Sequence, residues 1–260
     1  MFPTINEKIP ELLAMKHYPK KLYYKGNMAL LKRLKISIVG TRRPSLYTQN
    51  YTHLLAKALA KGGVCIVSGG AMGVDAIAHK GAGASSTIAV VANGLDIYYP
   101  KVNQSLLHSI EEEGLVLSQF EAGKSAQRWS FVVRNELVVA LGDVLVVTEA
   151  DKGSGTMHSV EYALKMGKEV WVLPQRLGES EGTQALLANH QAKAIYDIDA
   201  FVAQFALHQT QEEEKEDEFA HFCQKNPTFE EALARFGATL YEAELEGRIA
   251  IENGRIRWEG

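Results

Sequence analysis

The stretch Ser68–Gly73, Ser-Gly-Gly-Ala-Met-Gly, combines small residues with three glycines. It follows a short β-branched run that ends at Val67, and a helix-like run begins at Val74. A buried strand, a glycine-rich turn and a helix N-terminus can bind an anion, because the glycines let the backbone approach it and the free N–H groups attract it. Many α/β proteins use such a turn for packing alone, so this motif indicates a phosphate site only together with other loops.

Two further loops place donors of the same kind after predicted strands. In an open parallel sheet, ligands bind beyond the carboxyl ends of the strands, so all three loops are expected at one edge. The planar guanidinium group of arginine suits bidentate contact with phosphate. Such an edge can hold several phosphates, more than one mononucleotide offers. The expected phosphate-binding residues are Gly40, Thr41, Arg42, Arg43, Ser68, Gly69, Gly70, Gly73, Ser154, Gly155 and Thr156.

The stretch Arg128–Asn135 interleaves two aromatic residues with two arginines at the start of a predicted helix. Unpaired bases stack on aromatic rings, and arginines follow the nucleic-acid backbone. This composition predicts a site for single-stranded nucleic acid. The alternative for Trp129 and Phe131 is packing in the core. The alternative for the Arg134-Asn135 pair is a polar helix start.

Asp75 and His79 are four residues apart in a predicted helix and can meet across one turn. An acid–base pair or a metal site would need a third group at suitable spacing, and the sequence offers none. We expect Asp75 to cap the glycine-rich turn and His79 to hydrogen-bond nearby backbone. Asp96 is expected to fix its own loop, with a ribose contact as the alternative. The sequence therefore predicts no catalytic residue, no metal site and no cofactor.

Buried strands alternate with helices along residues 35–208. This alternation predicts a parallel sheet with helices on both faces. The expected fold class is α/β, with a Rossmann-like, mostly parallel sheet. Strands are predicted at 35–40, 64–67, 87–92, 115–118, 143–148, 169–173 and 194–196, and helices at 48–61, 74–80, 106–113, 131–141, 157–166 and 185–190.

Three other segments flank this region. Residues 1–34 are interpreted as an N-terminal extension with a helix at 7–16 and an extended stretch after it. Residues 209–218 carry a run of charge too polar to pack, which predicts an acidic linker. Residues 219–260 are predicted to form a small winged-helix-like domain of three helices and a hairpin. The helices are expected at 218–224, 229–236 and 239–244, and the hairpin at 248–259 with Asn253-Gly254 as its turn.

The composition is ordinary for a soluble globular protein: 260 residues, 46% hydrophobic and 23% charged. The sequence after Met1 lacks an apolar signal core and no window approaches a membrane span, so we expect a cytoplasmic protein without a membrane partner. The net charge of −3 is uneven, because residues 1–208 carry +4 and residues 209–260 carry −7. Any nucleic-acid site must therefore be a local patch, and the acidic C-terminal part is expected to contact protein rather than DNA.

Five motifs occur in a fixed order, VGTRRP, SGGAMGVDAIAH, NGLDIYYPKVN, FVVRN and SGT. In this order they resemble the DNA-processing protein A family, also called DprA or Smf, over residues 20–205. The tail resembles the winged-helix-like C-terminal domain of that family. The resemblance implies a protein of natural transformation that binds single-stranded DNA without catalysis. It further implies that the protein protects incoming DNA, loads the RecA recombinase onto it, and forms a homodimer through the Rossmann-like domain.

The resemblance also implies roles for individual residues. Phe131 matches the family's base-stacking aromatic residue, and Arg134-Asn135 matches its arginine–asparagine pair. Arg42, with Arg43, matches the DNA-binding arginine after the first strand. The other positions that match DNA-contacting residues are Gly40 and Thr41 beside that arginine, Ser68, Gly69, Gly70 and Gly73 in the second phosphate loop, and Arg128 as a basic residue facing DNA.

Three positions depart from the family's pattern. Glu136 stands where many members have a second arginine, Gln119 where a glutamate is usual, and Gln184 where an asparagine is usual. Glu136 lowers the local positive charge, so we expect it to reduce affinity for DNA rather than to abolish binding.

The main alternative is a nucleotide-binding enzyme that hydrolyses N-glycosidic bonds. Enzymes of that Rossmann group carry a glutamate three residues after a Gly-Thr pair. Here Ser159 stands at that position and Glu161 lies two residues further on. Because a helix turns by ~100° per residue, Glu161 is expected to point away from the site. A dinucleotide site is less well supported, because Ser68–Gly73 lacks the first glycine of that fingerprint and leaves Arg42 unexplained.

Overall fold

A computed structural model describes residues 2–252 and 254–259, and for residues 206–217 it describes the helical backbone alone. The chain forms two compact units, Met1–Ala206 and Leu207–Gly260. No helix in the described part of the chain is both long and apolar enough to cross a membrane.

The first unit is built on an eight-stranded sheet in the order β1-β5-β4-β3-β2-β6-β7-β8. All neighbouring strands run parallel except β1, which pairs antiparallel with β5 at one edge. The predicted Rossmann-like, mostly parallel sheet is confirmed. The strands are β1 Tyr23–Gly26, β2 Lys35–Val39, β3 Cys65–Gly69, β4 Thr87–Val91, β5 Leu115–Ser118, β6 Val144–Val147, β7 Val170–Val172 and β8 Lys193–Ala194.

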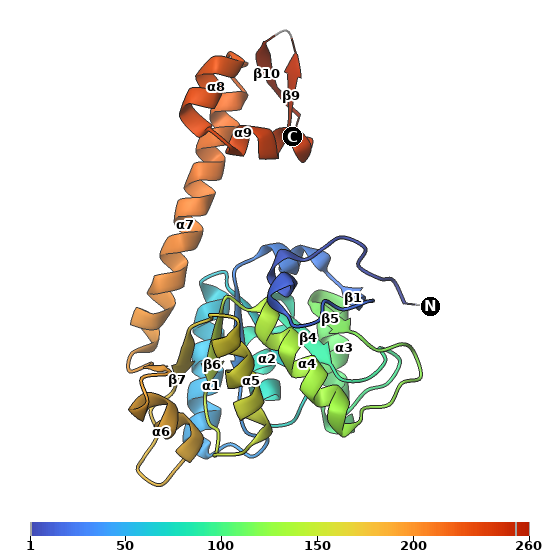
Figure 1. The fold of residues 1–260 in the computed structure, drawn as a ribbon, viewed down its shortest axis with the longest axis vertical. Coiled ribbons are helices and arrows are strands. Elements are labelled where there is room, and N and C mark those ends of the chain that lie inside the picture. The colour runs from blue at the N-terminus through green and yellow to red at the C-terminus, as the bar shows by residue number, and fades with distance from the viewer. Residues whose placement is uncertain (1, 253, 260) are drawn as a thin grey trace. The chain divides into compact units, whose positions relative to one another are not determined.

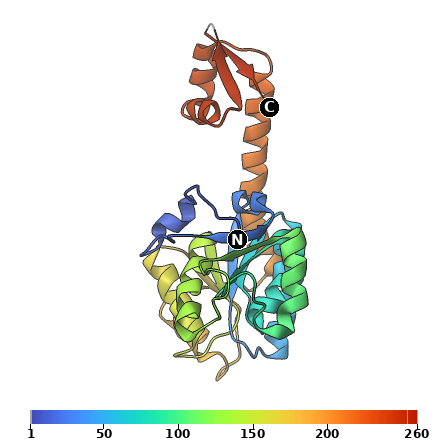
Figure 2. The ribbon, with the colours of Figure 1, turned by 90° about the vertical axis from the view of Figure 1, so that its right-hand side faces the viewer.

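Helices cover both faces of this sheet, as Figures 1 and 2 show. Helices α4 and α5 and the short helix η1 pack on one face, and α1, α2 and α3 pack on the other. The α-helices are α1 Leu46–Lys61, α2 Val74–Ala82, α3 Gln104–Glu113, α4 Arg128–Leu141, α5 Gly155–Lys165, α6 Glu181–Ala188 and α7 Ile198–Cys223. The 3-10 helices are η1 Pro10–Ala14, η2 Met28–Lys32, η3 Ala84–Ser86 and η4 Lys101–Asn103.

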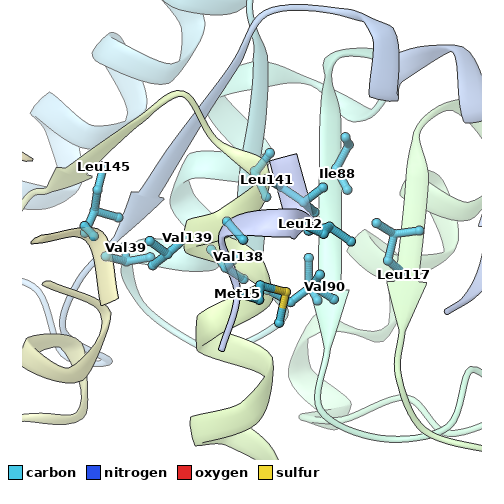
Figure 3. Close-up of a cluster of buried hydrophobic side chains, with 14 of the residues drawn as sticks. Leu12, Met15, Val39, Ile88, Val90, Leu117, Val138, Val139, Leu141 and Leu145 are labelled. Atoms are coloured by element: carbon cyan, nitrogen blue, oxygen red, sulfur yellow. The ribbon is translucent and has the colours of Figure 1, made fainter. Parts of the chain in front are cut away.

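The core lies between the sheet and these helices, because side chains along each strand alternate between its two faces. On β2, Ile36 and Ile38 pack toward α1 and α2, whereas Val39 packs toward α4. Figure 3 shows the hydrophobic cluster on the α4 side of the sheet. In it, Val138 of α4 and Leu12 of η1 lie over strands β2, β4 and β5. Strands buried on both faces explain the continuous apolar runs in the sequence.

The N-terminal segment differs in part from the prediction. A helix was expected at 7–16, but the structure contains only the 3-10 helix η1, with Pro10 in its first turn. The buried residues Ile9, Leu12 and Met15 are three apart, which suits the three-residue turn of a 3-10 helix. The extended stretch that follows becomes the edge strand β1. Residues 2–34 therefore contribute to the core and the sheet of the first unit.

The order of the strands reverses at β2. From β2 the chain builds β3, β4 and β5 in one direction, and it then returns to place β6 on the other side of β2. The loops after β2 and β6 therefore diverge at this switch point, and ligands of open α/β sheets bind in the crevice between such loops.

The second unit contains helices α8 Phe229–Phe236 and α9 Thr239–Leu245, and the strands β9 Ile249–Glu252 and β10 Arg255–Trp258. The predicted helix at 218–224 is instead the end of α7, whose helical backbone includes the charged stretch 209–218. Glu and Lys are good helix formers, so a charged run can be helical. Strands β9 and β10 pair as the expected antiparallel hairpin, while Asn253 of its predicted turn lies outside the described residues.

Candidate nucleic-acid interface

A pocket of about 760 Å³ opens at the switch point of the sheet. Its walls come from the loop after β2, the first half of α4 and the start of α5. The structure brings most of the predicted site residues together here. Those that line the pocket are Gly40, Thr41, Arg42, Gly69, Arg128, Phe131, Arg134, Asn135, Ser154, Gly155 and Thr156.

The loop after β2 is held against the start of α2. The backbone N–H of Thr41 donates to the carbonyl of Glu149 at 2.9 Å, and that of Val74 donates to the carbonyl of Thr41 at 3.1 Å. Gly73 precedes α2 with a φ of +78°, and a Cβ there would lie 2.5 Å from the Thr41 carbonyl oxygen. Gly73 therefore allows the close contact that fixes this loop, and Arg42 extends from the loop with its side chain exposed.

Two guanidinium groups lie close to the Phe131 ring at the pocket wall. The Cζ atom of Arg42 is 5.2 Å from the centre of the Phe131 ring, and that of Arg134 is 5.9 Å from it. The Tyr99 ring lies beside them, with its centroid 6.1 Å from that of Phe131. Aromatic rings next to arginines are the combination that stacks unpaired bases and contacts their phosphates.

Arg134 lines the pocket, but its side chain is almost fully buried. Its Nη1 donates to the carbonyl of Val90 at 2.9 Å and lies 3.8 Å from a carboxylate oxygen of Asp75. Burial raises the pKa of Asp75 and lowers the pKa of Arg134, and the attraction between the two charges opposes both shifts. The Nε of Arg134 is buried without a hydrogen-bond partner in the described part of the chain.

Gly69 and His79 support this ion pair. A Cβ at Gly69 would overlap the guanidinium group of Arg134 and crowd the carboxylate of Asp75. Gly69 therefore makes room for the pair, and because it also lines the pocket its predicted role in phosphate binding stays a prediction. His79 Nε2 is 2.8 Å from the Gly69 carbonyl oxygen, and its Nδ1 is 2.6 Å from Thr87 Oγ1. Burial lowers the pKa of His79 to about 4, and its expected hydrogen bond to nearby backbone is confirmed.

Four predicted residues do not line the pocket. Ser68 is fully buried and donates from Oγ to the Ile38 carbonyl at 2.6 Å, so its hydroxyl is part of the core. Gly70 lines a small neighbouring cavity. Gly73 affects the pocket indirectly, because it allows the loop with Thr41 and Arg42 to pack closely against it. Arg43 is exposed outside the pocket. Their adjacency in the sequence to lining residues suggested a shared site, but neighbouring residues of a strand or turn point in different directions.

The start of α5 forms the opposite wall. Ser154 is its N-cap residue, yet its side chain makes no capping hydrogen bond. Its Oγ is buried and has no partner among the described residues. Gly155 and Thr156 follow in the first turn and line the pocket. A helix N-terminus of this kind attracts an anion through its N–H groups and the helix dipole.

Helix α4, which carries six of the residues that line the pocket, is fixed at both ends. At its start, the side chains of Gln127 and Ser130 form a reciprocal capping box. At its end, Lys168 Nζ donates to the carbonyls of Val139, Ala140 and Gly142. Burial lowers the pKa of Lys168. These contacts fix the first turn of α4 and tie its end to the segment that follows α5.

Glu136, which departs from the family's pattern, has a structural role. Its carboxylate accepts a hydrogen bond at 2.8 Å from the backbone N–H of Lys16. It therefore fastens the N-terminal segment to α4. Glu161 is not among the residues that line the pocket, which agrees with the expectation, and its carboxylate lies 3.8 Å from Nδ1 of His158. Asp75 is the carboxylate that lines the pocket in the described part of the chain, and it is paired with Arg134.

Tyr99 is a lining residue that the sequence did not assign to the site. Its loop is fixed by Asn93, whose Nδ2 donates to the carbonyls of Gly94 and Ile97, and by Asp96, which accepts from the Gly123 N–H at 2.8 Å. The expected role of Asp96 in fixing its loop is therefore confirmed. Half of the Tyr99 side chain is exposed. An aromatic residue in the loop after β4, at the ligand edge of the sheet, was the signal that could have identified it.

Comparison with known proteins supports the resemblance found in the sequence. The family model of DNA recombination-mediator protein A matches residues 2–206. The DNA processing protein DprA of Streptococcus pneumoniae is 35% identical over 173 residues, which cover 65% of this chain and 61% of that protein. Protein Smf of Synechocystis is 33% identical over 192 residues, 72% of this chain and 48% of that protein. The chain thus spans about half to three fifths of the length of these relatives.

Solved structures show the same fold. The structure of DNA processing protein A from Helicobacter pylori is 43% identical and superposes with a TM-score of 0.76, covering 78% of this chain and 94% of that one. The X-ray structure of DprA from Streptococcus pneumoniae is 32% identical, with a TM-score of 0.73 and coverage of 78% and 74%. With a family model that matches most of its length, this chain belongs to the DNA recombination-mediator protein A family.

Proposed function

We propose that the pocket at the switch point binds single-stranded DNA. The observation that carries this proposal is the Phe131 ring at the wall of the pocket, with the guanidinium groups of Arg42 and Arg134 within 6 Å of its centre. The relative from Helicobacter pylori, 43% identical, was solved in a study of its single-stranded DNA binding mode. That relationship supports the same ligand class for this chain.

Each wall of the pocket has a distinct task in this proposal. The first turn of α5, with Ser154, Gly155 and Thr156, holds one phosphate through N–H and hydroxyl donors. Arg42 and Arg128 hold phosphates on the other walls. One base stacks on Phe131, with Tyr99 beside it. Arg134 acts differently, because its Nη1 is engaged by Asp75 and Val90, and its buried guanidinium group lies beside the Phe131 ring.

The wider function is inferred from the family. We propose that the protein acts in the cytoplasm in natural transformation as a recombination mediator without catalytic activity. In this role it protects incoming single-stranded DNA and loads the RecA recombinase onto it. It does so as a homodimer through the Rossmann-like unit, because two protomers on one strand bind more tightly than either alone.

Fluorescence anisotropy with an unstructured oligonucleotide tests the central step. The oligonucleotide is offered as a single strand and as a duplex at several salt concentrations. Binding that prefers the single strand and weakens with salt, as counterion release requires, supports the proposal. Equal binding of the duplex, or no binding of either form, contradicts it. Light scattering checks the homodimer, and a mass near that of one 28.7 kDa chain contradicts that part.

A further inference from the structure

A second aromatic residue with a cation beside it lies on the first turn of α4, at Trp129. Trp129 and Phe131 are two residues apart in one helix, so their side chains point ~200° apart. Phe131 lines the pocket and Trp129 does not. The Trp129 side chain is 49% exposed, although an indole ring is among the most costly groups to leave in water.

The indole of Trp129 is held in one orientation. Its Nε1 donates to Oε1 of Gln127 at 2.6 Å. One edge packs on the buried ring of Phe120, with centroids 5.6 Å apart and planes at 75°. Lys124 Nζ lies 5.6 Å from the ring centroid, and the Lys124 side chain is exposed and can turn toward a phosphate. The ring is therefore a fixed surface that needs no rearrangement before it stacks on a partner.

This surface continues directly from the pocket. Gln127 and Arg128 line the pocket wall, and Trp129 follows them in the chain. Gln127 also accepts the hydrogen bond from the Trp129 indole, so this residue connects the pocket wall to the Trp129 ring.

We propose that Trp129 and Lys124 form an outer stacking site for the first base of single-stranded DNA beyond the pocket. The inference rests on the proposed function. Base stacking suits the flat, fixed indole, and Lys124 supplies a charge for the adjacent phosphate. A protein partner is the competing occupant, but the cation and the continuity with the pocket favour nucleic acid. The site extends the number of nucleotides bound without requiring any particular sequence.

A length series of oligothymidylates tests the proposal with the full-length chain. The variants are Trp129→Ala, Trp129→Phe and, as a matched control, Tyr196→Ala, which removes an aromatic side chain that is 86% exposed and does not line the pocket. For the shortest strand that binds, Trp129→Ala is expected to bind like the wild type. For longer strands it is expected to bind about 5- to 150-fold more weakly, the loss of one stacked base.

Two further readouts separate stacking from general damage. Trp129→Phe keeps a ring and is expected to retain part of the affinity for long strands. Tryptophan emission of the wild type is expected to fall when a long strand binds, and this quenching is lost in Trp129→Phe. Thermal unfolding of each variant shows whether it is folded.

The outcomes are distinguishable from failure of the proposed function. If the wild type binds single-stranded DNA but Trp129→Ala and Trp129→Phe match it at every length, without a loss of quenching, the outer site is wrong and the pocket proposal stands. That result also leaves the protein partner as the remaining occupant. If the wild type binds no single strand, the proposed function itself is wrong.

Discussion

The guanidinium group of Arg42 lies 5.2 Å from the centre of the Phe131 ring, although the two residues come from different elements of the fold. Arg42 belongs to the loop after β2 and Phe131 to helix α4. Their proximity joins a cation that can hold a phosphate to a ring that can stack a base. One nucleotide can therefore contact both residues.

Arg42→Ala is expected to weaken single-stranded DNA binding by about 1.5–3 kcal/mol for each charged hydrogen bond lost. The slope of log affinity against log salt is expected to fall by ~0.7 for each phosphate contact removed. Arg43→Ala is the matched control, because Arg43 is the next residue, is exposed and does not line the pocket. Anisotropy titrations at several salt concentrations measure both quantities, and equal effects of the two substitutions would argue against this pocket.

Phe131→Ala is expected to cost about 1–3 kcal/mol of binding free energy, the contribution of one stacked base. The salt slope should stay unchanged, because no charge is removed. Phe131→Trp keeps a ring and should retain most of the affinity. The same titrations measure the effect, and a changed slope in Phe131→Ala would indicate that the cluster of cations had moved.

Asp75→Asn is expected to destabilise the first unit by about 3–5 kcal/mol, because it leaves the buried charge of Arg134 without its counter-ion. Denaturant unfolding measures this free energy. Glu161→Gln is the control, since that carboxylate is exposed and lies outside the pocket. A similar small effect of both substitutions would show that the buried pair contributes little.

His79 is expected to make stability depend on pH. Burial lowers its pKa to about 4 in the folded protein, against about 6.5 for an unperturbed histidine side chain. Between these values the unfolded chain binds the extra proton and the folded chain does not, so stability falls as pH falls from 6.5 toward 4. The loss reaches about 3 kcal/mol at pH 4. Denaturant unfolding at pH 7 and pH 5 should show a smaller difference for His79→Gln than for the wild type.

Gly73→Ala is expected to weaken DNA binding, because the new Cβ would press on the Thr41 carbonyl and displace the loop that carries Arg42. Gly153→Ala provides the control. Gly153 has a similar φ of +73°, but a Cβ there meets no described atom within 4 Å. Gly153→Ala should cost about 1–2 kcal/mol of stability for its positive φ, and Gly73→Ala should cost more, because its Cβ also meets backbone atoms of Thr41 and Arg42. Only Gly73→Ala should lower the affinity in anisotropy titrations, and an equal loss in both would point to strain alone.

Much of the first unit was predictable because its strands are buried on both faces and leave continuous apolar runs between polar loops. The location of the site at one edge followed from the parallel topology. The roles of Ser68 and Gly69 did not, because they depend on Ile38 and Arg134, which are distant in the sequence. The glycine motif shows that these positions need small residues. It does not show which side chain occupies the space next to them, such as the Arg134 guanidinium group beside Gly69.

Helix α4 illustrates the same limit. Helical spacing places Phe131, Arg134 and Val138 on one side, and all three line the pocket. Spacing alone could not show that Arg134 is buried against Asp75 while Arg128 stays exposed. The extent of α7 was missed for another reason, since high charge was interpreted as the absence of structure.

The antiparallel pairing of β1 with β5 also bears on solubility. Strand β5 would otherwise present unpaired N–H and carbonyl groups along a flat apolar edge, where a second molecule could add and start aggregation. The opposite edge is β8, a strand of two residues that includes the exposed Lys193. Strand β1 of the N-terminal segment thus covers one edge of the sheet, and the other edge is protected because β8 is short and carries a lysine. Concentrated protein should therefore resist strand-to-strand association at this sheet as long as residues 23–26 remain paired with β5.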